Sequence, residues 1–171
     1  CFVHRQVRAL AREGCDVQVL CPVPWAPRLA VRSEKRRLWA GIPRENLIEG
    51  IPVTYSRYPA VPHGRGLGLQ SYGMAVGVCR DLRRMVGKAD ILHAHMVYPD
   101  GFTASLLRRA LGLRIPLCVT AHGSDVRLYG ERLVTAYQVA RCVRRADAMI
   151  TGHPEIAGLL TTMGRNDVAM I

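Results

Sequence analysis

The sequence predicts an α/β domain with an open, mainly parallel, Rossmann-like sheet and helices on both of its faces. Helical and extended segments alternate along almost all of the 171 residues, as expected for parallel strands joined by helical crossovers. The extended segments are short and largely apolar, which is typical of strands that are buried on both faces. Since 49% of the residues are hydrophobic, the chain can bury the core of one domain.

Each element is predicted from apolar spacing and from the residues that break helices and strands. Residues 71–86 carry apolar side chains every three or four positions, as on one face of a helix, whereas residues 115–120 (IPLCVT) form the run expected of a buried strand. Pro22 ends the first predicted strand, and Pro154 suits the first turn of a helix. The predicted helices are residues 2–13, 71–86, 101–111, 131–145 and 154–163, and the predicted strands are 16–21, 51–59, 90–94, 115–120 and 147–151.

Other segments are less regular. Residues 28–50 are basic and give no clear assignment. The glycine-rich stretch from His63 to Gln70 is predicted to be a loop, either a flexible connection or a loop on the binding side that orders when a ligand binds. The opening helix implies a strand before Cys1, and residues 168–171 resemble the start of another strand. We therefore interpret residues 1–171 as one domain that is truncated at both ends.

The charge and cysteine content of the chain indicate which binding partners and which compartment to expect. The net charge of +11, carried almost entirely by arginine, favours anionic partners, although arginines on solvated helix faces explain much of it. An anionic membrane surface is the next alternative, and nucleic acid is not expected because aromatic and basic residues do not interleave. The six cysteines form no CxxC pair, which indicates reduced thiols in a cytoplasmic protein.

Two stretches hold the candidate functional residues, ADILHAHMVYPDG at 89–101 and VTAHGSDV at 119–126. Each follows or ends a predicted strand, and consecutive parallel strands end at the same edge of a sheet, where ligands bind. Gly123 would let a ligand approach the backbone, Gly101 would expose a helix N-terminus to an anion, and Asp125 would cap a turn or accept a sugar hydroxyl. The residues expected at this edge are His95, Asp100, Gly101, His122, Gly123 and Asp125.

The residue types at this edge are compatible with two functions. His93 and His95 present two imidazoles on one strand, which is a common start of a zinc or iron site. With Asp100 or His122 as a third ligand, they would suit a metal-dependent hydrolase. The same sheet edge could also belong to a non-catalytic sugar-binding module. His93 is itself expected to pack against a neighbouring strand.

Four segments together resemble a known family. These are FVHRQVRALAREGCDVQVLCPVPW, GIPVTYSRYP, ADILHAHMVYPDGFTASLLRRALGLRIPLCVTAHGSDV and ADAMITGHPEIAGLLTTMG. They cover nearly the whole chain and are similar to the N-terminal half of a family 4 retaining glycosyltransferase of the GT-B fold. Bacterial enzymes of surface-polysaccharide or teichuronic-acid assembly show the most similar pattern. The segment from DILHAH to AHGSD is the most specific.

This resemblance implies a function, and it implies that acceptor and donor bind to different domains. The N-terminal domain would hold a lipid-linked or polysaccharide acceptor, and a C-terminal domain outside this chain would hold the nucleotide-sugar donor. His122 would be the catalytic residue beside the transferred sugar. Gly123, Asp125, His95, Asp100 and Gly101 would bind substrate. No metal or cofactor is implied, and the enzyme would act in the cytoplasm, at the inner face of the membrane.

The chain also departs from the family pattern. Many relatives carry serine where His153 stands, at the N-cap of the last predicted helix. The glycine-rich loop that abuts the donor phosphates would precede Cys1. Residues 1–171 alone are therefore expected to be inactive.

Overall fold

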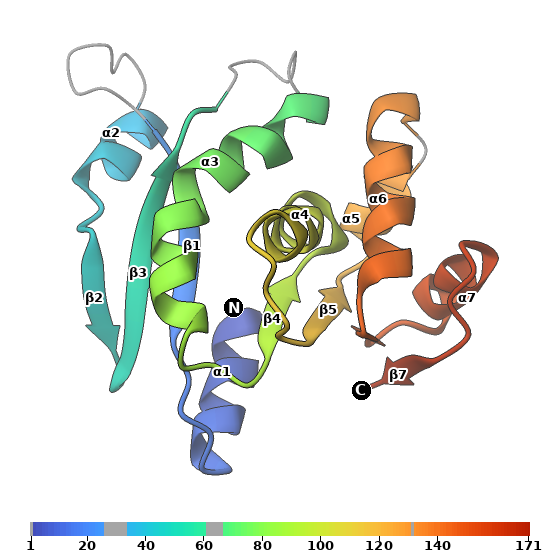
Figure 1. Cartoon of the computed structure of the whole chain (residues 1–171), viewed down its shortest axis with the longest axis horizontal. Helices are drawn as coiled ribbons and strands as arrows, with labels where there is room; N and C mark the ends of the chain where they lie inside the picture. The colour runs from blue at the N-terminus through green and yellow to red at the C-terminus, as the bar shows by residue number, and fades with distance from the viewer. Residues whose placement is uncertain (1, 26–33, 61–66, 131) are drawn as a thin grey trace.

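The computed structural model describes residues 2–25, 34–60, 67–130 and 132–171. Strands and helices alternate, so the predicted α/β class is confirmed (Figure 1). The strands are β1 (Val19–Pro24), β2 (Glu45–Ile48), β3 (Ile51–Tyr58), β4 (Leu92–His95), β5 (Leu117–Ala121), β6 (Ala148–Thr151) and β7 (Val168–Met170). The helices are α1 (Phe2–Arg12), α2 (Glu34–Gly41), α3 (Leu67–Val86), the π-turn η3 (Val97–Gly101), α4 (Phe102–Ala110), α5 (Ser124–Gly130), α6 (Leu133–Arg145) and α7 (Pro154–Thr162).

The strands form two sheets rather than the single sheet that was expected. One sheet has the order β1-β3-β2 and the other has the order β4-β5-β6-β7. All pairs in the second sheet are parallel, and in the first sheet β1 and β3 are parallel while β2 is antiparallel. The two edge strands β1 and β4 do not pair with each other.

Strand β1 starts and ends three residues later than predicted. The expectation that Pro22 ends it was wrong because β1 is an edge strand, paired only with β3. Trp25 donates its backbone N–H to Tyr58 O at 2.7 Å, so alternate positions point toward β3 and Pro22 and Pro24 point to the unpaired edge. Proline is tolerated there because no ladder hydrogen bond is lost.

Strands β2 and β3 form a hairpin that the sequence did not reveal. Ile48 pairs with Ile51 across a two-residue turn, Glu49-Gly50, in which both residues have positive φ. Such a turn matches the twist of a hairpin. Strand β2 is short and mostly exposed, so it lacks the apolar alternation that marks a strand.

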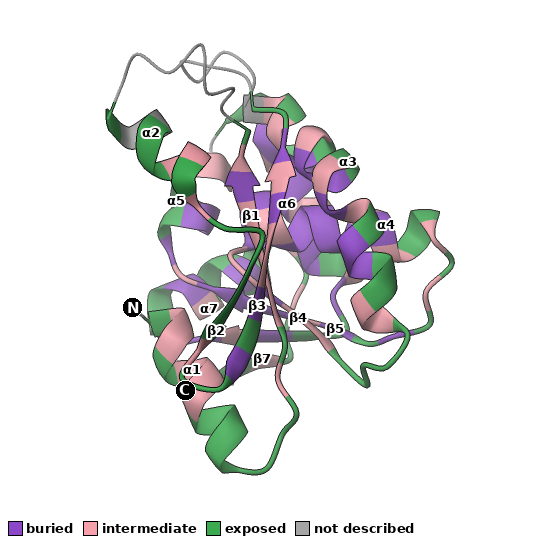
Figure 2. Cartoon of the chain, turned by 90° about the vertical axis from the view of Figure 1, so that its left-hand side faces the viewer, coloured by how far each residue is buried: buried purple, intermediate pink, exposed green. Residues whose placement is uncertain are grey.

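Helices cover both faces of the sheets (Figure 2). Helices α3, α4 and α6 pack against one another in one layer, and α1 and α7 lie on the opposite side of the strands. The main core lies around β5 and β6, where Leu117, Val119 and Met149 are fully buried. A second core cluster joins the sheets, since α3 packs on Tyr58 and Leu92.

Helix α3 approaches the first sheet closely through two glycines. A Cβ on Gly73 would lie 2.5 Å from the carbonyl oxygen of Pro59, and one on Gly77 would lie 2.5 Å from that of Arg57. Helix α3 begins at Leu67, four residues earlier than predicted. The predicted loop of residues 63–70 therefore ends in helix, and its residues 63–66 lie outside the described residues.

Candidate active site

The tips of β4 and β5 bring two histidines together. These strands are parallel neighbours with His95 opposite Thr120 in the register, so both chains leave the sheet at the same edge. His122 follows β5 directly, and its Nε2 lies 3.3 Å from Nδ1 of His95. The prediction that imidazoles from two consecutive strands meet at one sheet edge is confirmed.

A third imidazole extends this pair into a row. The ring of His93 stacks on that of His95 with centroids 4.6 Å apart, as expected for side chains two positions apart on one strand. His93 Nε2 forms a hydrogen bond of 2.8 Å with the hydroxyl of Thr120 on β5, which confirms that His93 packs against the neighbouring strand. Phe2 of α1 closes the row, with its ring edge-on to His122 at 5.1 Å.

The row is not arranged as a metal centre. His93 Nε2 is occupied by Thr120, and His95 and His122 direct nitrogens at each other. Across residues 2–25, 34–60, 67–130 and 132–171, no group of three or more His, Cys, Asp or Glu side chains has a geometry that could hold an ion. This geometry does not support the metal-dependent hydrolase reading based on His93 and His95.

Burial and mutual repulsion keep the first two imidazoles neutral. Burial, followed by the neighbouring His93 and His122, lowers the pKa of His95 to about 4. Burial and His122 also lower the pKa of His93. At neutral pH His95 therefore carries one ring N–H, and one of the two rings in the His95–His122 pair donates while the other accepts.

Asp125 holds the backbone of the site in place through hydrogen bonds to two segments. It is fully buried, and its Oδ1 accepts the backbone N–H of His122 at 3.0 Å while its Oδ2 accepts that of Val97 at 2.6 Å. One carboxylate thus ties the segments that follow β5 and β4 to each other. Of the two predicted roles for Asp125, the geometry shows the turn cap.

The backbone around the site adopts left-handed conformations at two positions. Gly123 has φ of 106°, where side chains are strongly disfavoured, and its carbonyl accepts N–H groups from the first turn of α5. Met96, just after β4, has φ of 75°, and such backbone strain in a non-glycine residue is concentrated at functional sites. The chain therefore turns sharply at both strand tips.

Asp100 lies close to the same edge and faces the first sheet. Burial raises its pKa to about 6, the Asp125 charge adds to this, and a local backbone hydrogen bond opposes it. The Asp100 charge in turn raises the pKa of Cys21 on β1 and of Tyr58 on β3, although burial is the main cause in both. Asp100 is thus a carboxyl group within electrostatic range of β1 and β3 in the first sheet.

Gly101 differs from its expected role. It is the N-cap of α4, as the predicted helix start at residue 101 implies, but as the last residue of η3 it is buried and donates its N–H to Met96 O at 2.9 Å, so it is not open to an anion as expected. A Cβ there would lie 2.8 Å from Cys142 Sγ. The residue allows close packing beneath the site, and it does not offer a free anion-binding N–H.

Two contributors to the site were missed by sequence reasoning. Thr120 was assigned only to a strand, although threonine in an apolar run next to a histidine-bearing strand is the signal that would have drawn attention to it. Phe2 is separated from His122 by most of the chain, and no local pattern relates them. His153 does occupy the N-cap of α7 as predicted, without a side-chain capping bond.

Residues 2–171 match the family described as the glycosyl transferase 4-like domain. The chain belongs to this family. It is also 31% identical over 130 residues to a Bacillus subtilis (strain 168) protein named as the teichuronic acid biosynthesis glycosyltransferase TuaC. That alignment covers 75% of this chain and 33% of the relative, so the chain matches about a third of the length of this curated relative.

These findings make the chain a glycosyltransferase domain in general terms. None of the helices in the described part of the chain is long and apolar enough to cross a bilayer.

Proposed function

We propose that this domain is the acceptor-side half of a retaining glycosyltransferase that uses a nucleotide-sugar in cell-surface polysaccharide assembly. The observation that carries this proposal is the convergence of His95 and His122 at the carboxyl edge of two parallel strands, in a chain of the glycosyl transferase 4-like family. The donor would be held mainly by a second domain beyond residues 1–171. The acceptor would be lipid-linked or a glycan, and the enzyme would work at the cytoplasmic face of the membrane.

Sugar transfer requires groups at this edge of the sheet that stabilise developing charge. The bond from the anomeric carbon to the donor diphosphate breaks, and its electron pair leaves with the nucleoside diphosphate. The acceptor hydroxyl oxygen forms the new bond on the same face of the sugar, and its proton passes to an oxygen of the departing diphosphate. Donors that are already oriented stabilise the charge that develops, because they need no reorganisation during the reaction.

Each residue of the site would have a different role in sugar transfer. His122 would contact the transferred sugar through its ring nitrogen, held in orientation by His95 and by the Asp125 carboxylate under its backbone. Gly123, which lacks a side chain at the turn, would let the sugar approach the main chain. Asp100, with a pKa of about 6, is ionised at neutral pH and would accept a hydrogen bond from the acceptor hydroxyl. Gly101 would contribute through packing.

The decisive experiment is the substitution His122→Ala in the full-length protein. Loss of one preorganised donor lowers turnover by about 10²–10³-fold, so sugar transfer measured with a radiolabelled donor should fall by that amount. Circular dichroism should be unchanged, because His122 is only partly buried.

The matched control is His153→Ala, since His153 caps α7 without a side-chain bond and lies outside the row. Transfer by His122→Ala at the rate of the His153→Ala control would refute the role of His122. Retention is tested separately by the anomeric configuration of the product in proton NMR, and an inverted product would contradict it.

A further inference from the structure

Helices α3 and α6 each expose a stripe that changes from apolar to basic along its length. On α3 the exposed positions are Leu69, Tyr72 and Val76, followed by Arg80 and Arg83, which recur at the spacing of one helix face. Val76 is 76% exposed. Single exposed apolar residues are ordinary, but a row of them on one face indicates a contact surface.

Helix α6 repeats the pattern beside it. Leu133, Val134 and Tyr137 are exposed in its first half, with Leu133 at 95%, and Arg141 and Arg144 follow on the same face. Arg141 lies over the Tyr137 ring, with 5.5 Å between the guanidinium carbon and the ring centroid. An arginine that packs on an aromatic ring keeps its charge at the surface while its stem covers apolar area.

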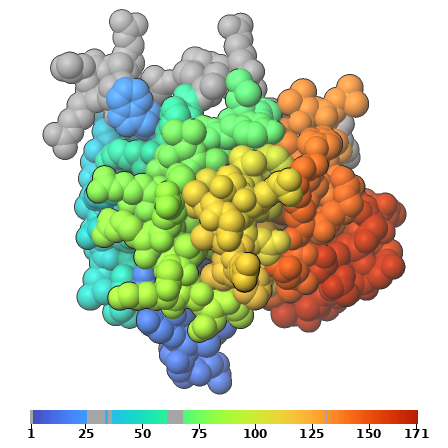
Figure 3. All heavy atoms as spheres, viewed as in Figure 1, coloured from blue at the N-terminus to red at the C-terminus, as the bar shows by residue number. Residues whose placement is uncertain are grey.

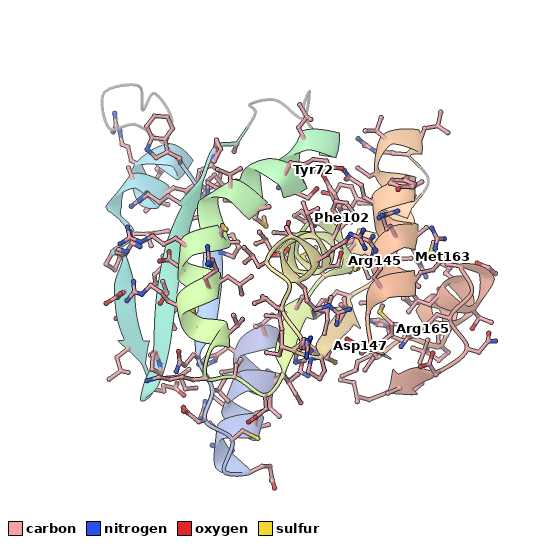
Figure 4. All side chains as sticks on the ribbon, in the orientation of Figure 1. Tyr72, Phe102, Arg145, Asp147, Met163 and Arg165 are labelled. Carbon is pink, nitrogen blue, oxygen red and sulfur yellow. The ribbon has the colours of Figure 1, made fainter. Side chains whose placement is uncertain are left out.

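The two apolar halves form one surface. A Cβ added to Gly68 of α3 would meet the Val134 side chain of α6, and Gln138 of α6 donates to the carbonyl of Gly68 at 2.8 Å. Tyr72 packs edge-on against Phe102 at the start of α4, with ring centroids 5.9 Å apart (Figure 4). We call the exposed residues Leu69, Tyr72, Val76, Leu133, Val134 and Tyr137 the apolar patch.

The same face is almost purely cationic. Figure 3 shows α3, α4 and α6 side by side on one side of the molecule. Within these three helices the one acidic residue is Asp81, which is 5% exposed and bonded to Ser56 and Arg44. The arginines of the three helices are Arg80, Arg83, Arg84, Arg108, Arg109, Arg141, Arg144 and Arg145.

A hollow among these arginines adds a place for an anion. It has a volume of about 220 Å³ and is lined by Ser105, Arg108, Arg109, Leu113 and Arg145. Partial burial, followed by Arg141, Arg109 and Arg108, lowers the pKa of Arg145, so its positive charge is held among like charges. Arg108 already donates to the Asp147 carboxylate and to the Arg145 carbonyl, so Arg109 and Arg145 are the cations through which the hollow would hold an anion.

We propose that the face formed by α3, α4 and α6 is a docking surface for an anionic lipid bilayer. The apolar patch would enter the interfacial layer, and the arginines would contact lipid phosphates, with one phosphate in the hollow. An acyl-chain region accepts aliphatic and aromatic side chains, and anionic headgroups supply the charge that this face lacks. Helices α3 and α6 begin at the carboxyl edge of the strands, so docking would bring the His95–His122 edge near a lipid-linked acceptor. That last consequence rests on the proposed function.

The test is sedimentation of the full-length protein with vesicles of phosphatidylcholine alone or mixed with phosphatidylglycerol. Binding should require the anionic lipid and should weaken with salt. One arginine near an anionic surface contributes about fivefold to partitioning, so Arg109→Glu should weaken binding by at least that factor. Leu133→Glu and Val76→Glu should weaken it by about tenfold or more, because each removes apolar area and adds an anion.

Matched controls carry the same changes on other surfaces. Leu47→Glu alters an exposed leucine of β2, and Arg12→Glu alters an exposed arginine of α1; both should bind vesicles more tightly than the face variants. Sugar transfer to a water-soluble acceptor should be unchanged in Leu133→Glu, which separates this proposal from the role of His122.

Three results would overturn the proposal. One is equal binding to neutral and anionic vesicles. Another is binding that the face variants and the controls reduce alike. The third is a change in oligomeric state, or in contact with another part of the protein, in Leu133→Glu while vesicle binding persists, because the patch would then be a protein interface.

Discussion

At the scale of single residues, Asp125 joins the two backbone segments that form the site. Its two oxygens satisfy the backbone N–H groups of His122 and Val97 in a fully buried setting. An unsatisfied buried donor costs about 1–3 kcal/mol. The substitution Asp125→Ala is therefore expected to lower the free energy of unfolding by about 2–5 kcal/mol, measured by urea denaturation.

The control for this prediction is Asp90→Ala at an exposed position before β4. Surface substitutions of this kind usually change stability by less than about 0.5 kcal/mol. Equal stabilities of the two variants would contradict the bridging role of Asp125.

The neutral state of His95 predicts a pH dependence of stability. The folded pKa is about 4 against an ordinary value of 6.5, so between these values the unfolded chain binds a proton that the folded protein does not. Stability is then lost as the pH falls from 6.5 toward 4. The variant His95→Gln should lose less stability than the wild type between about pH 7 and about pH 5, measured by urea unfolding; a steeper loss in the variant would refute this.

Asp100 changes the pH dependence of folding stability in the opposite direction to His95. Its folded pKa of about 6 lies above the ordinary 3.8, so the folded protein retains a proton that the unfolded chain releases. This stability is present below pH 3.8 and is lost as the pH rises through about 6. Asp100→Asn should therefore remove a decline in stability that the wild type shows across that range. Unfolding curves of the two proteins that run parallel from acid to neutral pH would argue against it.

At this scale the sequence identified His95 and His122 because both stand at the end of an apolar run, where topology brings strand tips together. It left two roles open for Asp125, because a short loop does not reveal which backbone groups are buried beneath it. It misassigned Gly101 because the close approach of Cys142 comes from α6, which is distant in the chain.

At the scale of elements, α3 was predicted well because its apolar residues recur over a long stretch. Strand β1 was misplaced because proline looks like a strand end unless the strand is known to lie at an edge. Strand β2 was missed because its register comes from pairing with β3 and not from its own composition.

The close packing of α3 on β3 predicts a sharp difference between two glycines. In Gly77→Ala the new Cβ would lie 2.5 Å from Arg57 O and 2.5 Å from Tyr58 Cβ, so α3 must shift; overpacking of this kind costs about 1–3 kcal/mol. Gly158→Ala in α7 meets nothing within 4 Å and should stabilise by up to about 1 kcal/mol through helix propensity. Thermal unfolding of both variants provides the measurement, and destabilisation by Gly158→Ala equal to that by Gly77→Ala would contradict the packing argument.

At the scale of the whole molecule, the alternation of elements predicted the α/β class but not the division into two sheets. Within the described residues β1 and β4 are not paired, and the residues of neither strand indicate which strand lies beside it. Charge was likewise predicted as a total, whereas its concentration on α3, α4 and α6 emerges only when the three helices are packed in one layer.

The two sheets also predict an order of local stability. Strand β5 is paired on both sides and its Leu117 and Val119 are fully buried, whereas β2 is an exposed edge strand. In native-state hydrogen exchange the amides of β5 should exchange last and those of β2 early. Equal protection of β2 and β5 would mean that the two sheets open together.

The prolines of β1 have a consequence for solubility. An open strand edge is a template on which another chain can add a strand and begin an aggregate. Pro22 and Pro24 lie on the side of β1 that faces away from β3 and supply no N–H there, so a six-residue edge loses two of the donors that an incoming strand would need. This side of β1 can therefore offer few backbone hydrogen bonds to any strand that lies along it, whether that strand comes from another molecule or from the same protein.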